Sequence, residues 1–351
     1  MEPHAPIVKP AVAATPMAFV RAMLSACERL KHDPSALLVE AQISPTQVAL
    51  PQARITSAQM EKLSDQLMRD LDDEALGWFH RRLPWGSYGM LARASITAPT
   101  LKVAMQRWCR HHALLTDDIR LVLGEAETPV GRCATLTLEE DHAGPWLTGE
   151  LREFCHVSLL RNLLGLSSWL VDSRIPLWGV DLVFDAPPHA VAYGVLFNGP
   201  CRFGQPRTRL LFHRHYLDLP LRRDETALRQ MLQRALPLTV HIYRKDRLLV
   251  SRVRQTLVHQ PDTLRNAQLL ADALHTSVRT LHRQLKEEGA SLQTLKDEVR
   301  RDRAIHLLLR TSQPVKKIAL AVGFDNDKSF LRAFKRWTGL TPREFHARPL
   351  P

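Results

Sequence analysis

Two short stretches near the end of the chain carry basic side chains at helical spacing. They are SVRTLHRQLKEEG (277–289) and NDKSFLRAFKRWTG (326–339). A guanidinium can bond O6 and N7 of guanine at once, whereas groups farther from the base edges suit phosphate oxygens. The side chains predicted to contact bases are Arg279, His282, Arg283, Asp327, Lys328 and Arg332, and those predicted to contact phosphates are Lys286, Lys335 and Arg336.

Each basic face needs a helix that is held from its opposite side. Ser277 and Asn326 are expected to cap these helices at their N-termini, and Gly289 and Gly339 are expected to end them. The predicted buried stripes are Leu281 with Leu285 in the first helix, and Phe330, Phe334 and Trp337 in the second.

The two helices belong to an internal repeat. LADALHTSVRTLHRQLKEEG (270–289) aligns with IALAVGFDNDKSFLRAFKRWTG (318–339), with a tight turn expected at Gly323 of the second copy. Residues 292–310 are predicted to form one long bridging helix. Two recognition helices on one face of a duplex need roughly 34 Å between them. A basic helical bundle with a solvated face is the alternative, but caps, stripes and bridge in register favour DNA binding.

The charge distribution separates the chain into two parts. Residues 241–351 hold 22 Lys and Arg against 11 Asp and Glu, a net of +11, which leaves 26 against 25 in residues 1–240. A basic part attached to a nearly neutral part indicates that only the second part contacts a polyanion.

The first part mixes helical and strand periodicities, which predicts an α+β fold, and every strong pattern after it is helical, which predicts an all-α second part. Helices are expected at 17–31, 56–70 and 99–115, and strands at 119–123, 133–139, 177–184 and 209–213. The expected organisation is a disordered leader (1–15), an effector-sensing or dimerisation domain (16–220), a linker (221–245) and a double helix-turn-helix domain (246–351).

Several residue patterns test whether the first part is an enzyme or a metal protein. His213 and His215 alternate on a predicted strand, but no further ligands follow at a supporting spacing. No nucleophile elbow or Gly-rich phosphate loop is present. The five cysteines are scattered without a Cys-x-x-Cys pair. We therefore expect no cofactor, no metal and a cytoplasmic location, with an enzyme fused to a DNA-binding tail as the minor alternative.

Aromatic and polar side chains in residues 78–112 are candidates for contacts with a small molecule. These are Trp78, His80, Trp85, Tyr88, Arg93 and His112. Arg93, near a Gly-rich turn, is the candidate for binding an anion. The alternative for Trp78 is an ordinary place in the hydrophobic core.

The second part resembles the DNA-binding domain of the AraC/XylS family of bacterial transcription regulators. The matching motifs are ADALHTSVRTLHRQLKEEG, the bridge VRRDRA, and PVKKIALAVGF followed by SFLRAFKRWTGLTPREF. The base-contacting residues named above also match the family's base-reading positions. One departure is His275, where the family commonly has Gly in the first turn; because His tolerates positive φ, an intact turn is expected.

The first part is similar to the N-terminal domain of the ornithine-utilisation-regulator branch of that family. The similarity rests on residues 75–115 and on CRFGQPRTRLLFHRHYLDLPL (201–221). It implies a cytoplasmic activator that binds double-stranded promoter DNA and RNA polymerase and responds to an unidentified small-molecule effector, with no membrane contact. Homodimerisation, repression in place of activation, and effector-independent binding stay open alternatives.

Overall fold

The computed structural model describes residues 15–128, 131–140, 142–197, 199–236, 249–287, 290–311 and 313–346. The chain divides into two compact units, Met1–Ala126 with Cys133–Lys245, and Asp246–Pro351 with Glu127–Arg132. Residues 1–14 of the expected leader, residues 237–245 of the expected linker, and Gly289 lie outside the described residues.

The first unit contains a five-stranded sheet with the strand order β3-β4-β7-β5-β6. β4 pairs with β7 in antiparallel register, β7 pairs likewise with β5, and β5 pairs with β6 in parallel. The strands are β3 (Arg120–Thr128), β4 (Gly131–Glu139), β5 (Leu177–Asp181), β6 (Cys201–Arg202) and β7 (Thr208–His213). The predicted strand segments are confirmed; of the five strands in this sheet, β6 alone had no counterpart among them.

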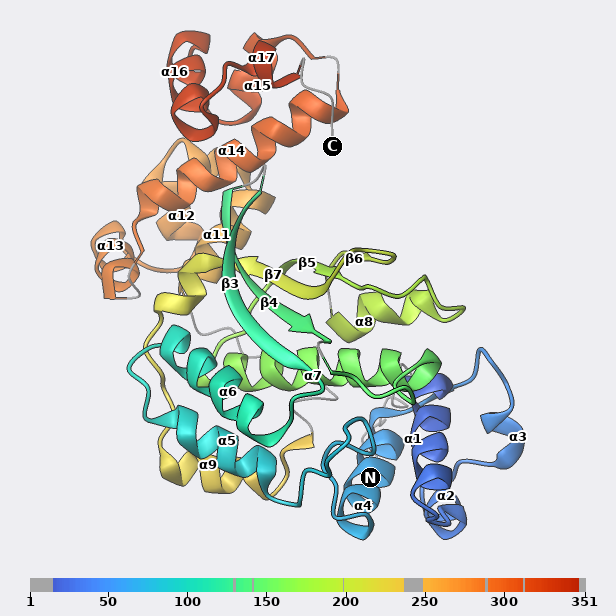
Figure 1. The fold of residues 1–351 in the computed structure, drawn as a ribbon. Coiled ribbons are helices and arrows are strands. Elements are labelled where there is room, and N and C mark those ends of the chain that lie inside the picture. The colour runs from blue at the N-terminus through green and yellow to red at the C-terminus, as the bar shows by residue number, and fades with distance from the viewer. Residues whose placement is uncertain are drawn as a thin grey trace, which may run out of the picture. The chain divides into compact units, whose positions relative to one another are not determined.

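Helix α7 (Gly149–Leu170) runs along the sheet and forms the centre of this unit (Figure 1). Seventeen of its 22 residues are buried, so it has no polar face. Apolar residues on every side give no stripe at helical spacing, which explains why the sequence pattern did not reveal this helix.

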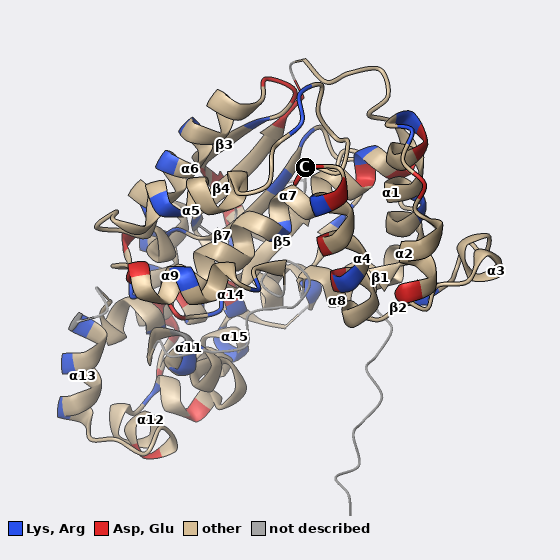
Figure 2. Ribbon diagram, turned by 90° about the horizontal axis from the view of Figure 1, so that it is seen from below, with Lys and Arg blue, Asp and Glu red and all other residues tan. Residues whose placement is uncertain are grey.

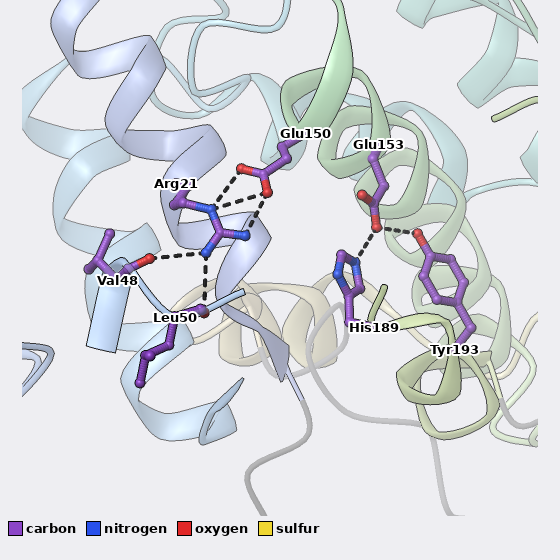
Figure 3. A network of polar contacts seen from close by, with 7 residues as sticks. All are labelled: Arg21, Val48, Leu50, Glu150, Glu153, His189 and Tyr193. Atoms are coloured by element: carbon purple, nitrogen blue, oxygen red, sulfur yellow. Dashed lines mark hydrogen bonds and ion pairs between the residues drawn. The ribbon is translucent and has the colours of Figure 1, made fainter. Parts of the chain in front are cut away.

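Charged side chains on α7 are matched by partners from other elements (Figure 3). Glu150 accepts hydrogen bonds from Arg21, whose guanidinium also donates to the carbonyl of Val48. The Glu153 carboxylate, which is buried, contacts His189 Nε2 and Tyr193 Oη, both at 2.6 Å. A buried carboxylate is costly unless it is hydrogen-bonded, so this network holds residues 189–193 against α7.

The remaining helices of the first unit pack around α7 and the sheet. The expected helices at 17–31, 56–70 and 99–115 are confirmed as α1 (Met17–Arg29), α4 (Ser57–Asp70) and α6 (Leu101–Leu115). α9 (Glu225–Leu232) lies within the range expected to be a linker and packs on α5 (Ser87–Ile96). The other elements are β1 (Thr15–Pro16), α2 (Ser35–Glu40), α3 (Pro45–Val48), β2 (Arg54–Ile55), the 3₁₀ turns η1 (Ala190–Ala192) and η2 (Arg214–Asp218), and α8 (Tyr193–Phe197).

Residues 249–346 of the second unit, over the ranges that the structure describes, form helices and no strands, as predicted. Its elements are α11 (Leu249–His259), the 3₁₀ turn η3 (Pro261–Leu264), α12 (Ala267–Ala273), α13 (Val278–Glu287), α14 (Leu292–Arg310), α15 (Val315–Ala321), α16 (Asp327–Thr338) and α17 (Pro342–His346). α14 is the predicted bridge. Residues up to Val299 belong to one apolar cluster with α11–α13, and residues from Ala304 belong to a second with α15–α17.

Candidate nucleic-acid interface and ligand pocket

Helix α13 has one buried and one exposed face. The hydroxyl of Ser277 accepts a hydrogen bond from the backbone N–H of Thr280 at 3.1 Å, which confirms the predicted cap. Leu281 and Leu285 are fully buried. The predicted contact residues therefore point to solvent, and Figure 2 shows the Lys and Arg bands along α13. The exposed side chains are Arg279, His282, Arg283 and Lys286.

Helix α16 repeats this arrangement with aromatic residues. Asn326 Oδ1 accepts from the backbone N–H of Ser329 at 2.8 Å. Phe330 and Phe334 are fully buried, whereas Trp337 is only half-buried against the same cluster. Gly339 ends the helix at φ 75°, in the left-handed region that glycine favours. The exposed predicted contacts are Asp327, Lys328, Arg332, Lys335 and Arg336.

Counted from the caps, three positions carry a cation in both helices, and the first of these is Arg279 or Lys328 at the second residue. Arg283 and Arg332 are each the sixth residue after the cap, and Lys286 and Lys335 are each the ninth. The helices therefore share these three cationic positions, although one is held by leucines and the other by phenylalanines, and they differ in charge at Asp327.

Two turns precede these helices, and both have a positive φ. Gly323 has φ +82°, and a Cβ there would lie 3.1 Å from Leu264 Cβ. His275, at the corresponding point of the first half, has φ +54°. The expected intact turn at His275 is thus confirmed, with a backbone conformation that non-glycine residues seldom adopt.

Arginine side chains join the two halves of the second unit. Arg300, on α14, donates to the carbonyl of Leu264 at 2.8 Å and to that of Gly323 at 3.3 Å. Arg265 donates to the carbonyl of Leu320 at 3.0 Å. Burial lowers the pKa of Arg300, and its guanidinium lies 4.9 Å from the Phe324 ring centroid. These contacts, which we call the arginine seam, connect the halves beside the turn at Gly323.

Two features of α16 were not anticipated from the sequence. Arg336, predicted to contact phosphate, is ion-paired at 3.1 Å with Asp297 of α14. Leu331 is 38% exposed beside Arg332, where an apolar side chain can contact a thymine methyl group. Its position out of phase with the Phe330 and Phe334 stripe is the sequence signal that could have identified it.

A pocket of about 270 Å³ lies in the first unit among α4, α5, α7 and α9. Three predicted effector contacts, Trp85, Tyr88 and Arg93, line it together. Reasoning from the sequence missed the other walls because they come from helices distant along the chain. The additional lining residues are Asp65, Met68, Arg69, Glu74, Gly86, Gly89, Asn162, Leu232, Gln233, Ala235 and Leu236.

The other three predicted effector contacts lie outside this pocket. Trp78 is buried in the core, with its ring centroid 5.4 Å from that of Phe154. His80 is exposed and lies beside Trp146. His112 is buried against Phe79, neither ring nitrogen has a hydrogen-bond partner among the described residues, and burial lowers its pKa to about 4.

His213 and His215, considered above as metal ligands, are joined by a hydrogen bond between the ring of the first and the backbone of the second. His213 Nδ1 accepts a hydrogen bond from the backbone N–H of His215 at 3.0 Å. The structure, over the ranges it describes, groups no three His, Cys, Asp or Glu side chains in a way that could hold a metal ion. Over the same ranges, no helix is both long and apolar enough to cross a membrane.

Two family models match the chain. Residues 32–221 match the N-terminal arabinose-binding domain of AraC transcription regulators, and residues 270–348 match a helix-turn-helix domain. The first model describes a domain of transcription regulators, and neither model describes an enzyme.

Individual proteins show the same similarity. The ornithine utilization regulator of Pseudomonas aeruginosa is 26% identical over 95% of this chain and 96% of its own length. The transcriptional regulator VqsM of the same organism is 37% identical over 28% of this chain and 30% of its own. Among solved structures, the regulator CdpR from P. aeruginosa is 19% identical, covers 94% of this chain and 98% of its own, and has a TM-score of 0.35.

Proposed function

The chain belongs to the AraC family of DNA-binding transcription regulators with an arabinose-binding-type N-terminal domain, and on this premise we propose that it activates promoters in response to a small-molecule effector. The observation that carries the proposal is the pair of capped helices, α13 and α16, with matching exposed basic faces. An α-helix held from behind with a basic outer face fits the major groove of DNA.

The roles of individual side chains follow from their places on the two helices. We assign base contacts to Arg279, His282, Arg283, Asp327, Lys328 and Arg332, and phosphate contacts to Lys286, Lys335 and Arg336. Asp327 is the exception in charge. A carboxylate in a DNA groove needs a cytosine amino group or a neighbouring cation, and Lys328 is adjacent to it.

The first unit supplies the sensing function in this proposal. Its nearly neutral charge argues against additional DNA contact, and its pocket is of a size that suits a small metabolite. We assign effector sensing or dimerisation to residues 16–220, a connecting role to 221–245, and DNA binding to 246–351. Contact with RNA polymerase, a homodimeric state and a cytoplasmic location complete the proposal.

A genome-wide map of bound sites, combined with a promoter fusion, tests this function. We expect sequence-specific sites near promoters, higher expression from the fusion when the gene is present, and loss of that increase when it is deleted. Expression that rises on deletion would establish repression instead of activation. Equal binding to specific and random DNA would contradict a regulatory role.

A further inference from the structure

The pocket in the first unit contains polar groups that are already paired. Arg69 forms an ion pair with Asp65 at 3.0 Å, and its guanidinium lies 4.0 Å from the Trp85 ring centroid. The Glu74 carboxylate accepts hydrogen bonds from the backbone N–H groups of Gly86 and Tyr88 at 2.8 and 2.6 Å. The charges of Arg69 and Asp65 offset each other, whereas the charge of Glu74 is held by backbone N–H groups.

Two residues that line the same pocket carry hydrogen-bond donors that are not fully used. The Tyr88 hydroxyl is buried and has no hydrogen-bond partner among the described residues. The Arg93 guanidinium is 51% exposed and has one long contact, 3.4 Å from Nε to Glu225 Oε1. A buried hydroxyl without a partner is unfavourable, so an acceptor that reaches it is stabilising. Both groups can donate a hydrogen bond to a ligand acceptor, and the positive charge of Arg93 favours an acceptor with negative charge.

The pocket also has apolar lining residues, from α4, from α9 and from the segment after α9. Met68, Leu232 and Leu236 line it, and Gly89 allows Leu232 to approach α5 closely, since a Cβ on Gly89 would lie 3.3 Å from Leu232 Cδ1. We propose that this pocket binds a small organic carboxylate, with its carboxylate on Tyr88 and Arg93 and its apolar body against Leu232 and Leu236. This assignment rests on the proposed function of the first unit as a sensor.

The same geometry gives the ligand a means of regulation. α9 has eight residues, of which only Leu228 is fully buried, and it contacts α5 through Leu232 and the Arg93–Glu225 ion pair. A ligand that fills the space between α5 and α9 adds contacts to both helices. Leu236, which lines the pocket after α9, precedes the second unit by only ten residues of chain. Binding therefore stabilises the docked position of α9 at the point where the chain leads into the DNA-binding unit.

The test uses the full-length protein and three sets of matched probes. Hexanoate and benzoate are the carboxylates, hexanamide and benzamide the neutral analogues, and hexylamine and benzylamine the cations. We expect the carboxylates alone to raise the melting temperature and to slow hydrogen exchange in residues 225–236. Tyr88→Phe and Arg93→Gln should each weaken carboxylate binding about tenfold or more.

A matched variant controls for the loss of a surface arginine. Arg110 is exposed on α6 and does not line the pocket, so Arg110→Gln should bind the carboxylates with wild-type affinity. Tyr88→Phe deletes only an unpartnered hydroxyl, so it should fold normally. Stabilisation by amides or amines in place of carboxylates, or by no probe, would overturn the ligand class. Carboxylate binding that Tyr88→Phe and Arg93→Gln leave unchanged would overturn the site.

Specific DNA binding by the same preparations is measured separately. If it persists while the carboxylate site fails, the inference is wrong and the proposed regulatory function stands. If specific DNA binding is absent, the proposed function itself fails.

Discussion

Arg283 and Arg332 occupy the same place on two helices, six residues after the cap, and both are exposed. A guanidinium at this place can bond two acceptors of a guanine. We predict that Arg283→Ala or Arg332→Ala costs roughly 1–3 kcal/mol of binding free energy and relaxes preference at one or two base pairs. Affinity measured against a series of singly substituted operators checks this.

Lys335 is the contrasting residue on α16. Because we assign it to a phosphate, Lys335→Ala should weaken all operators alike and reduce the slope of log affinity against log salt by about one. The same operator series at two salt concentrations measures both effects. Equal, uniform losses for Arg283→Ala and Lys335→Ala would contradict the division into base and phosphate contacts.

His112 predicts a pH effect on the stability of the first unit. Burial lowers its folded-state pKa from 6.5 to about 4, so the unfolded chain takes up a proton more readily. The contribution of neutral His112 to the free energy of unfolding is fully present above about pH 6.5. It is lost as the pH falls towards 4, by on the order of 3 kcal/mol. Urea unfolding from pH 7.5 to 4 should show this loss, and His112→Leu should reduce the slope. An unchanged slope in the variant would show that other groups dominate.

At the scale of elements, the two turns before α13 and α16 make opposite predictions. Gly323→Ala forces a side chain into positive φ at 3.1 Å from Leu264, so we expect a loss of more than about 1 kcal/mol of unfolding free energy. His275→Gly should be neutral or stabilising by a few tenths to about 1 kcal/mol, because glycine adopts the positive φ at this position without backbone strain. Denaturant unfolding of both variants provides the comparison.

The Gly323 turn also touches the arginine seam, so its substitution should affect DNA binding. We expect Gly323→Ala to weaken binding to an operator with two half-sites more than to a single half-site, since Arg300 and Arg265 fix the halves relative to each other. If Gly323→Ala lowers stability but leaves the affinity for both operators unchanged, the turn does not control the alignment of the two helices, and the prediction is wrong.

How well the sequence predicted each element depended on its pattern of burial. α13 and α16 have one apolar stripe and a capping side chain, so their boundaries and exposed faces were predictable to within a residue or two. α7 is buried on all sides and gave no periodic signal. The pocket was predictable only in part: Trp85, Tyr88 and Arg93 lie close in sequence, whereas Asn162 and Leu232 reach them through tertiary packing.

At the scale of the whole molecule, the division after Lys245 predicts that the second unit is self-sufficient. This unit has two apolar clusters of its own. Nearly all of the chain's excess positive charge lies in residues 241–351. We therefore expect a fragment of residues 241–351 to fold, to bind the same DNA within a modest factor in affinity, and to be indifferent to the effector. Circular dichroism and operator binding measure these properties. An unfolded fragment, or one that still responds to the effector, would contradict the division of labour.

The two separate clusters along α14 have a consequence for how such a regulator can change over generations. Leu281 and Phe330 lie in different clusters, so altering the exposed residues of one recognition helix leaves the packing behind the other intact. Each half of the operator can then drift and be matched by its own half of the protein, one substitution at a time. The arginine seam uses backbone carbonyls as acceptors, which every sequence supplies, so it keeps the halves aligned throughout such a succession.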